Sequence, residues 1–217
     1  MTQALPINPV VVDISSYQQV RDWGAVQRSG IAGVIHKATE GGTWTDKTYD
    51  AKRQGADAEG GFLWGAYHFM RPGDMVAEAD FFLSVAAPDA DDLLVLDHED
   101  AGVSLDDLKK CLARVDEVTG RLTAIYSGSV LKEQLAAAGG ADPELSKRRL
   151  WLPQYWTRWV CPPGWTKPWL WQFTDGSVGP TPHSVPGIPS GGVDVNSYDG
   201  TNAQLASEWA GASIVAA

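Results

Sequence analysis

Short apolar runs recur along the chain and predict eight β-strands. The runs are NPVVVD (8–13), GVIHKA (33–38), FLWGAYHF (62–69), LLVLD (93–97), LTAIYS (122–127), LWLPQYW (150–156), LWQFT (170–174) and GVDVNS (192–197). Each run is rich in Val, Ile, Leu or aromatic residues, and turn-forming residues interrupt the chain between them. This is the pattern of a short strand.

Helix-like segments lie between the earlier strands. They cover residues 17–29, 47–59, 75–86, 105–119 and 130–138. The fourth has apolar residues at helical spacing. Ser104 stands just before it with Asp107 three residues further on, which predicts a capped N-terminus. Strands that alternate with helices of this length favour right-handed crossovers and a parallel sheet, which eight strands can close into a barrel.

The alternation of strand and helix fails after residue 155. Residues 157–168 and 174–191 are rich in Pro, Gly, Ser and Thr, and neither segment holds a crossover helix. We therefore expect an α/β fold, an incomplete (β/α)8-like (TIM-type) barrel with helices missing between the last strands. The chain has no internal repeat, low-complexity tract or linker, so residues 1–217 are expected to form a single domain.

Charge and hydropathy narrow the classes of partner. A formal net charge of -10 disfavours a nucleic-acid backbone as partner, because that would require clustered Lys and Arg. No stretch approaches the roughly 20 apolar residues of a membrane-spanning helix, so we expect no membrane partner. The start MTQALPINPV lacks the basic region and apolar core of a signal peptide. We therefore expect synthesis in the cytoplasm without a signal peptide.

The stretch LLVLDHED places acids at the end of a predicted strand. Side chains alternate along a strand, so Asp97 and Glu99 share one face. The carboxyl ends of barrel strands form the rim where catalytic loops meet. Two close carboxyls raise the pKa of one of them, which gives the protonated acid and ionised partner of glycosidic bond cleavage. For an isolated D-x-E motif, the alternative to a catalytic role is two solvated acids at the end of a strand.

Further acids lie at the ends of other predicted strands. Asp13 follows the first run, Asp194 lies near the end of the last run, and Tyr67 lies on the third. The first and last strands of a closed barrel are neighbours, so these residues are expected to line the same mouth as Asp97 and Glu99. A turn-forming or capping role is the alternative for either aspartate taken alone.

Six ordered motifs resemble those of glycoside hydrolase family 25, the Chalaropsis-type lysozymes. They are VDISSYQ, DWGAVQRSGIAGVIHKATEG, GAYHF, VLDHED, WQFT and GVDVNSYDG, and they run from about residue 10 to about residue 200. The resemblance implies an N-acetylmuramidase on a flattened, incomplete (β/α) barrel. Such an enzyme cuts the β-1,4 bond between N-acetylmuramic acid and N-acetylglucosamine in the glycan strands of bacterial peptidoglycan.

The resemblance also implies roles for the acids. Glu99 matches the proton donor, and Asp97 matches either the nucleophile or the residue that orients the 2-acetamido group of the substrate. Asp13 and Asp194 match the two further active-site acids of the family, and the anomeric configuration is expected to be retained. A domain without a signal peptide or a separate cell-wall-binding module is similar to a phage endolysin, so we expect a monomer that lyses bacterial walls after phage-type release or other export.

Aromatic residues suit a sugar polymer, because an aromatic face stacks on the C–H groups of a pyranose. The candidate substrate-binding residues are Tyr67, Tyr126, Tyr155, Trp156 and Trp171. Trp156 is the preferred platform, since it follows Tyr155 at a predicted strand end. For each of the ten tryptophans the alternative is packing in the core or anchoring of a loop.

The sequence does not show the residue patterns that metal-dependent or cysteine-dependent catalysis requires. The four histidines show no metal-ligand spacing, so we expect no metal and no cofactor, and His68 and His98 are interpreted as structural. Cys111 and Cys161 are expected to be free thiols without activation. Two rival functions stay open: a catalytically silent peptidoglycan-binding module, and a chitinase-like glycosidase on the same class of fold.

Overall fold

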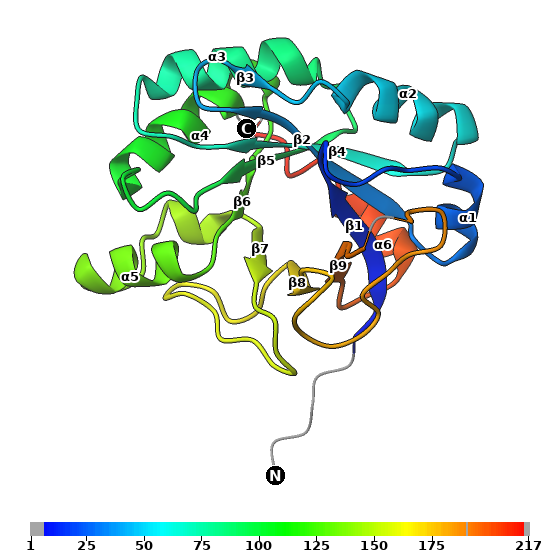
Figure 1. Cartoon of the computed structure of the whole chain (residues 1–217). Coiled ribbons are helices and arrows are strands. Elements are labelled where there is room, and N and C mark those ends of the chain that lie inside the picture. The colour runs from blue at the N-terminus through cyan, green and yellow to red at the C-terminus, as the bar shows by residue number, and fades with distance from the viewer. Residues whose placement is uncertain (1–6, 190, 215–217) are drawn as a thin grey trace.

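A ring of eight strands forms the centre of the computed structural model, which describes residues 7–189 and 191–214 (Figure 1). The strands are β1 (Pro9–Ile14), β2 (Gly33–Glu40), β4 (Leu63–Phe69), β5 (Leu93–Asp97), β6 (Ala124–Tyr126), β7 (Leu150–Pro153), β8 (Leu170–Thr174) and β9 (Asp194–Ser197). Their order is β1-β9-β8-β7-β6-β5-β4-β2, and the pairing of β1 with β2 closes the ring. All eight predicted strands are confirmed. The two-residue β3 (Trp44–Thr45), which the sequence analysis missed, pairs with the end of β2.

Helices surround the first part of the ring. They are α1 (Trp23–Arg28), α2 (Tyr49–Glu59), α3 (Met75–Ala86), α4 (Leu105–Thr119), α5 (Ser129–Ala137), the 3-10 helix η1 (Leu145–Lys147) and α6 (Asn202–Glu208). α3 and α4 have the predicted bounds, and the predicted Ser104 cap is confirmed by its bond from the Asp107 amide at 3.2 Å. α1 begins later than predicted, because Asp22 caps it by accepting from the Ala25 amide. Among the described helices none is long and apolar enough to span a membrane.

The last connections carry no helix. Residues 154–169, and the described part of 175–193, run as loops, which appear in yellow and orange beside β8 in Figure 1. The predicted absence of helices here is confirmed. The expected direction of the last strand was wrong, because β9 runs antiparallel to both β8 and β1. Its connection stays at the carboxyl-end rim and does not cross back along the barrel, so the strand starts at the rim.

Side chains alternate between two apolar layers. The inner layer fills the barrel, and the outer layer lies between the strands and the helices. The indole of Trp209, which follows α6, belongs to the inner layer and donates to the Trp64 carbonyl at 2.6 Å. Gly33 leaves room for this ring, since a Cβ there would lie 2.8 Å from Trp209 Cη2. The tryptophan therefore fills the barrel near the start of β2.

The inner positions turn polar towards the carboxyl ends of the strands. Val11, Ile35 and Val95 lie in the apolar interior, and two residues further along the same strands stand Asp13, Lys37 and Asp97. The same alternation turns Tyr67, Tyr126, Gln172 and Asn196 into the interior at this carboxyl-end rim. One end of the barrel is thus packed with apolar side chains, and the other end carries the polar residues of the candidate site.

The two cysteines are free thiols, as predicted. Cys111 is buried on α4 and Cys161 is half-buried in the loop before β8. Burial raises the pKa of both thiols, to about 11 for Cys161. Neither thiol is activated as a nucleophile.

A buried ion pair anchors α4 to the strand region. Asp116 accepts from the Thr123 amide at 2.8 Å and pairs with Arg148 at 2.6 Å, and both charged side chains are less than 10% exposed. Replacement of Asp116 by Ala leaves Arg148 buried without a counter-charge. We therefore expect Asp116→Ala to lower the free energy of unfolding by about 3–5 kcal/mol in urea denaturation followed by circular dichroism.

The matched control lies on the same helix. Asp106 pairs with Lys109 at 3.1 Å, but its side chain is 81% exposed. Asp106→Ala is expected to change the free energy of unfolding by less than about 1 kcal/mol. Equal losses in the two variants would contradict the assigned role of the buried pair.

Candidate active site

Four acidic side chains meet at the carboxyl-end rim of the barrel. Asp13 is buried near the end of β1, Asp97 is the buried last residue of β5, and Glu99 is exposed two residues further on. Asp194 is half-buried and lies directly opposite Asp13 in the β1–β9 register. The sequence analysis placed Asp194 near the end of its strand, which was wrong: it is the first residue of β9. It reaches the rim because β9 runs in reverse.

Asp97 is the most enclosed of these acids. It is 4% exposed, and its Oδ1 is buried without a hydrogen-bond partner among the described residues. Burial raises its pKa well above the usual range, and the charge of Glu99 raises it further. The Lys37 ammonium opposes this shift. An acceptor that is shut off from water and unpaired is costly, so this oxygen is suited to a donor that a bound molecule supplies.

Glu99 combines access with a raised pKa. The residue is exposed, but the surrounding rim withdraws its carboxyl partly from water. That desolvation is the larger cause of its raised pKa, and the negative charge of Asp13 is the second. Glu99 therefore keeps a proton to higher pH than an ordinary glutamate does, at a position that a large substrate reaches.

Asp13 and Asp194 form a carboxyl pair with unequal proton affinity. Burial raises the pKa of Asp194 to about 9, and the charge of Asp13 and a hydrogen bond to it add to the effect. Burial also raises the pKa of Asp13 above its ordinary value, and bonds from Asn196, Gln172 and Asp194 oppose part of that rise. Asp194 is therefore the protonated member that donates, and Asp13 is the charged member.

Two buried amides hold Asp13. Gln172 Nε2 lies 3.1 Å from Asp13 Oδ1 and 2.9 Å from Oδ2, and Asn196 Nδ2 donates to Oδ2 at 2.8 Å. Gln172 and Asn196 face each other in the β8–β9 register. The sequence analysis missed both. Their signal was present as polar residues inside the apolar runs LWQFT and GVDVNS, at positions that alternation turns inward.

The three predicted tyrosines gather beside the acids. Tyr126 and Tyr155 donate their hydroxyls to Gln172 Oε1 at 2.8 and 2.9 Å. Tyr67 lies on β4, next to β5, and its pKa is raised well above 10 by burial and then by the charge of Asp97. The structure thus brings all three to the mouth that holds the acids.

The two predicted tryptophans lie in different places. Trp156 is 64% exposed beyond the end of β7, at the same rim. Trp171 is 3% exposed and lies on the face of β8 opposite to Gln172. It donates to the Gln154 carbonyl at 2.9 Å and packs against Phe173. Its expected contact with substrate at the acidic mouth is therefore not supported, because strand alternation turns it outward.

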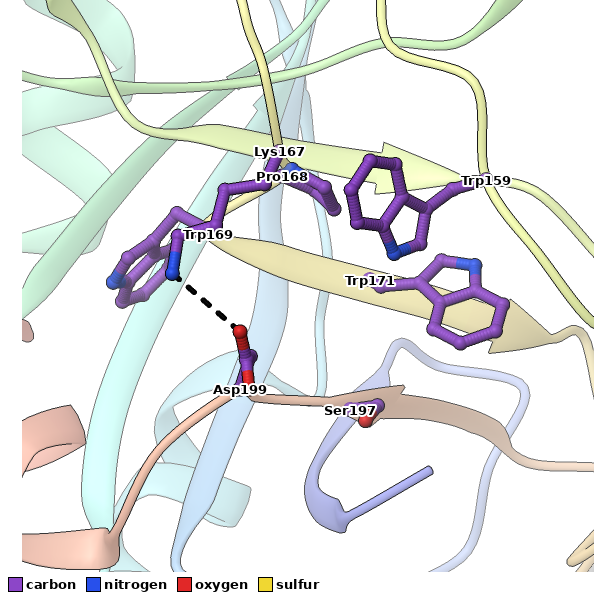
Figure 2. Close-up of a pocket in the computed structure, with 7 residues that line it drawn as sticks. All are labelled: Trp159, Lys167, Pro168, Trp169, Trp171, Ser197 and Asp199. Carbon is purple, nitrogen blue, oxygen red and sulfur yellow. Dashed lines mark hydrogen bonds and ion pairs between the residues drawn. The ribbon is translucent and has the colours of Figure 1, made fainter. Parts of the chain in front are cut away.

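Trp171 lines a separate small cavity on the outer wall. Figure 2 shows this cavity, which is lined by Trp159, Lys167, Pro168, Trp169, Trp171, Ser197 and Asp199. It has a volume of about 90 Å³ and lies where a crossover helix is missing. Lys167 and Asp199 form a long, exposed ion pair at 3.5 Å across its edge. The cavity belongs to the outer layer and not to the mouth.

A chain of charges borders the mouth on the side of β2 and β4. Lys37 pairs with Glu40 at 2.6 Å, and Arg71 bridges Glu40 at 2.7 Å and Asp100 at 2.9 Å. The Lys37 ammonium also lies 4.9 Å from the ring centre of Trp44, which is 43% exposed. The Arg71 pairs join the end of β2 to the loops after β4 and β5.

The buried histidines are structural, as predicted. His68 lies between Thr39 Oγ1 at 2.8 Å and Glu78 Oε2 at 2.9 Å, and all three side chains are buried. His98 bonds the Val103 carbonyl at 2.9 Å through Nε2. Neither imidazole is exposed, so neither reaches a substrate in the mouth.

The arrangement suits acid-catalysed cleavage of a glycosidic bond. It offers an accessible carboxyl with a raised pKa, Glu99, beside an enclosed carboxyl, Asp97, and a neighbouring negative charge on Asp13. A proton donor and a second carboxyl near one reacting carbon are the two groups that this reaction requires.

Comparisons with known proteins agree with this chemistry. A family model described as "Glycosyl hydrolases family 25" matches residues 12–181. The chain is 38% identical over 121 residues to an autolytic lysozyme of Clostridium acetobutylicum, a match that covers 56% of this chain and 32% of that protein. It spans about a third of the length of the curated relatives that it matches at this identity. The family match includes Asp13, Asp97 and Glu99 and ends before Asp194.

Solved structures share the whole fold. The bacterial lysozyme from Streptomyces coelicolor superposes with a TM-score of 0.79 at 26% identity, covering 94% of this chain and 98% of that one. The muramidase from Trichobolus zukalii superposes with a TM-score of 0.75 at 28% identity, covering 93% and 98%.

The raised pKa of Asp194 predicts a pH-dependent stability difference. Folded Asp194 keeps its proton to about pH 9, whereas an unfolded aspartate loses it near pH 4. Between these values the folded state binds more protons, so this group's contribution to stability falls as pH rises and is constant above about pH 9. Asp194→Asn keeps a donor towards Asp13 without titrating. We expect its free energy of unfolding, relative to that of the native protein, to rise from pH 4 to pH 9 and then level off.

Urea unfolding at a series of pH values measures this difference. Asp199→Asn is the control, because that side chain is 83% exposed. A stability difference for Asp194→Asn that stays flat between pH 4 and pH 9 would refute the protonated state of Asp194.

Proposed function

The chain belongs to glycosyl hydrolase family 25, and we propose on this basis that it is a peptidoglycan hydrolase. The substrate is the glycan strand of the bacterial cell wall, and the bond cleaved is the β-1,4 link between N-acetylmuramic acid and N-acetylglucosamine. One observation carries the proposal: four acids from β1, β5, the loop after β5 and β9 meet at the carboxyl-end rim of the barrel. Active sites of such barrels lie at this rim.

Glu99 acts as the general acid. Its raised pKa keeps a proton available, and its exposure leaves the carboxyl accessible to the bridging oxygen of a bound glycan. Transfer of that proton to the oxygen lets the C–O bond break as the leaving sugar takes the bonding electrons. The mouth is acidic and suits the positive charge that develops on the anomeric carbon.

Asp97 acts on the opposite side of the reacting sugar, either as a nucleophile or through the 2-acetamido group. The second role is favoured by the unpaired, buried Oδ1, because an acetamido N–H would supply the hydrogen bond that this atom lacks. With the N–H held there, the acetamido oxygen attacks the anomeric carbon, and water later opens the resulting ring. Both routes retain the configuration.

The glycan is bound by aromatic side chains around the acids. Trp156 provides an exposed platform beyond β7, and Tyr67, Tyr126 and Tyr155 line the mouth between β4 and the loop after β7. Trp44 stands beyond β2, half-way round the ring from β7 in the strand order. A glycan strand that runs from Trp156 to Trp44 therefore crosses the centre of the mouth.

The biological role is lysis or remodelling of bacterial walls. A relative carries the name autolytic lysozyme, and another similar structure is the CTP1L endolysin. The domain meets its substrate wherever the wall is exposed to it.

Glu99→Gln tests the general acid directly. The amide keeps the shape of the side chain but has no acidic proton to transfer to the leaving oxygen, so cleavage is expected to fall by about 10²- to 10⁴-fold. The measurement is release of new reducing ends from purified peptidoglycan, with free amines followed in parallel. The native protein should release reducing ends without amines, and the variant should still sediment with cell walls.

Glu117→Gln is the matched control, since its side chain is 70% exposed on α4. It should cleave like the native protein. If Glu99→Gln keeps more than about a third of the native rate, the acid has been misassigned. If the native protein binds walls but releases no reducing ends, the domain is a binding module instead.

The stereochemistry of the product tests the role of Asp97. Both the direct and the acetamido-assisted routes predict that the first product released is the β-anomer, because two displacements restore the original configuration. Proton NMR of a soluble glycan fragment, recorded before mutarotation, identifies the anomer. Initial appearance of the α-anomer would exclude both routes and indicate a water held as the direct nucleophile.

A further inference from the structure

The surroundings of Asp13 suggest a role for two buried amide residues. We propose that Gln172 and Asn196 are positioning residues that hold Asp13 as the charged member of the Asp13–Asp194 pair, and that this charge keeps Glu99 in its proton-donating form. The proposal rests on the proposed function of Glu99. It assigns a purpose to the acid pair that lies beside the reacting groups.

The orientation of Asn196 is determined by its neighbour. Trp151 Nε1 lies 2.6 Å from Asn196 Oδ1, and an indole nitrogen only donates hydrogen bonds. The facing atom of Asn196 is therefore the oxygen, and its NH₂ group must point to Asp13 Oδ2 at 2.8 Å. Both residues are 2% exposed or less, so no water replaces these bonds.

Gln172, which faces Asn196 on the neighbouring strand, is locked in the same way. Its Oε1 accepts from the hydroxyls of Tyr126 and Tyr155, which directs its Nε2 to both oxygens of Asp13. Gln172 is 1% exposed. A reversed amide would place its oxygen against the Asp13 carboxylate. It would also remove the acceptor to which the two tyrosine hydroxyls donate.

These fixed donors decide which aspartate is charged. Burial raises the pKa of Asp13 above its ordinary value, and three N–H contacts and the Asp194 proton oppose this rise and favour the ionised form. Among the described residues no amide side chain donates to Asp194, and Asp194 faces the Asp13 charge. The proton therefore resides on Asp194 and the negative charge on Asp13.

The Asp13 charge acts on Glu99 across the mouth. It is the charged group that raises the Glu99 pKa, after desolvation. The other titratable or charged groups around this mouth are Lys37 and Glu40 on β2, Tyr67 on β4, Asp97 on β5, Tyr126 on β6, Tyr155 after β7, Asp175 after β8 and Asp194 on β9. Of the groups around this mouth, Asp13 is the one whose charge raises the pKa of Glu99, so the proton of Glu99 depends on it.

Gln172→Leu tests the proposal, because leucine has a similar size and no donor. Asp13 then loses two contacts, takes up a proton, and no longer raises the pKa of Glu99. The alkaline limb of kcat/KM against pH, measured on a soluble glycan, should move to lower pH. On the acidic side of that limb the rate should fall by less than about tenfold, since Glu99 is still protonated there. Gln54→Leu, an exposed change on α2, should leave the profile unchanged.

A second readout separates this proposal from the proposed function. Carbon NMR titration of the Glu99 carboxyl needs no activity, and the midpoint should fall in Gln172→Leu and in Asp13→Asn, which removes the charge but keeps the shape. In the double variant the two shifts should not add. A Glu99 midpoint that stays the same or rises in either variant overturns the proposal, even if the native protein hydrolyses glycan. If Gln172→Leu does not fold, Asp13→Asn decides by the same measurement. A native protein without hydrolytic activity refutes the proposed function alone.

Discussion

The pairing of β1 with both β2 and β9 is the constraint on which the rest of the structure depends. β1 lies parallel to β2 and antiparallel to β9, and these two ladders close the ring. Closure sets which side chains face one another across the mouth. It places Asp13 opposite Asp194 and within electrostatic reach of Glu99, although Glu99 lies 86 positions further along the chain. In an open sheet β1 would be an edge strand, and its acid would face water instead of the amides of β8 and β9.

Four acids can lie close together in the closed barrel because their carboxyls are not all ionised at once. Asp194 holds a proton to about pH 9, and the buried Asp97 resists ionisation. Asp13 stays charged because two locked amides contact it. Neutralising some members and hydrogen-bonding the rest limits the cost of desolvating like charges. The same distribution of protons leaves one accessible acid, Glu99, ready to donate, so stability and chemistry derive from one network.

The missing helices shape the mouth as much as the strands do. Because the connection after β7 is a loop, its first residues stay at the rim, where Tyr155 lies beside the acids and Trp156 is exposed. The last loop also remains at the rim, which reverses β9 and presents Asp194 from the strand's first position. On the outer wall beside these loops, Trp159, Trp169 and Trp171 help to line the small cavity shown in Figure 2. Irregular chain on one side of the barrel is thus part of how the site is built.

The sequence by itself determined the eight strands, the bounds of α3 and α4, and three of the rim acids, because each depends on local periodicity, capping and the order of residues along one strand. The sequence also placed Asp194 at the mouth, although at the wrong end of its strand. The family resemblance added the roles of the acids, and these roles remain proposals. Only the tertiary structure decided the direction of β9, the outward face of Trp171, and the bonds of Gln172 and Asn196 to Asp13. The physical reason is that each of these depends on a partner from a distant part of the chain. From the sequence alone, an amide in an apolar run indicates only an interruption of that run. Closure of the ring places a buried carboxylate within its reach.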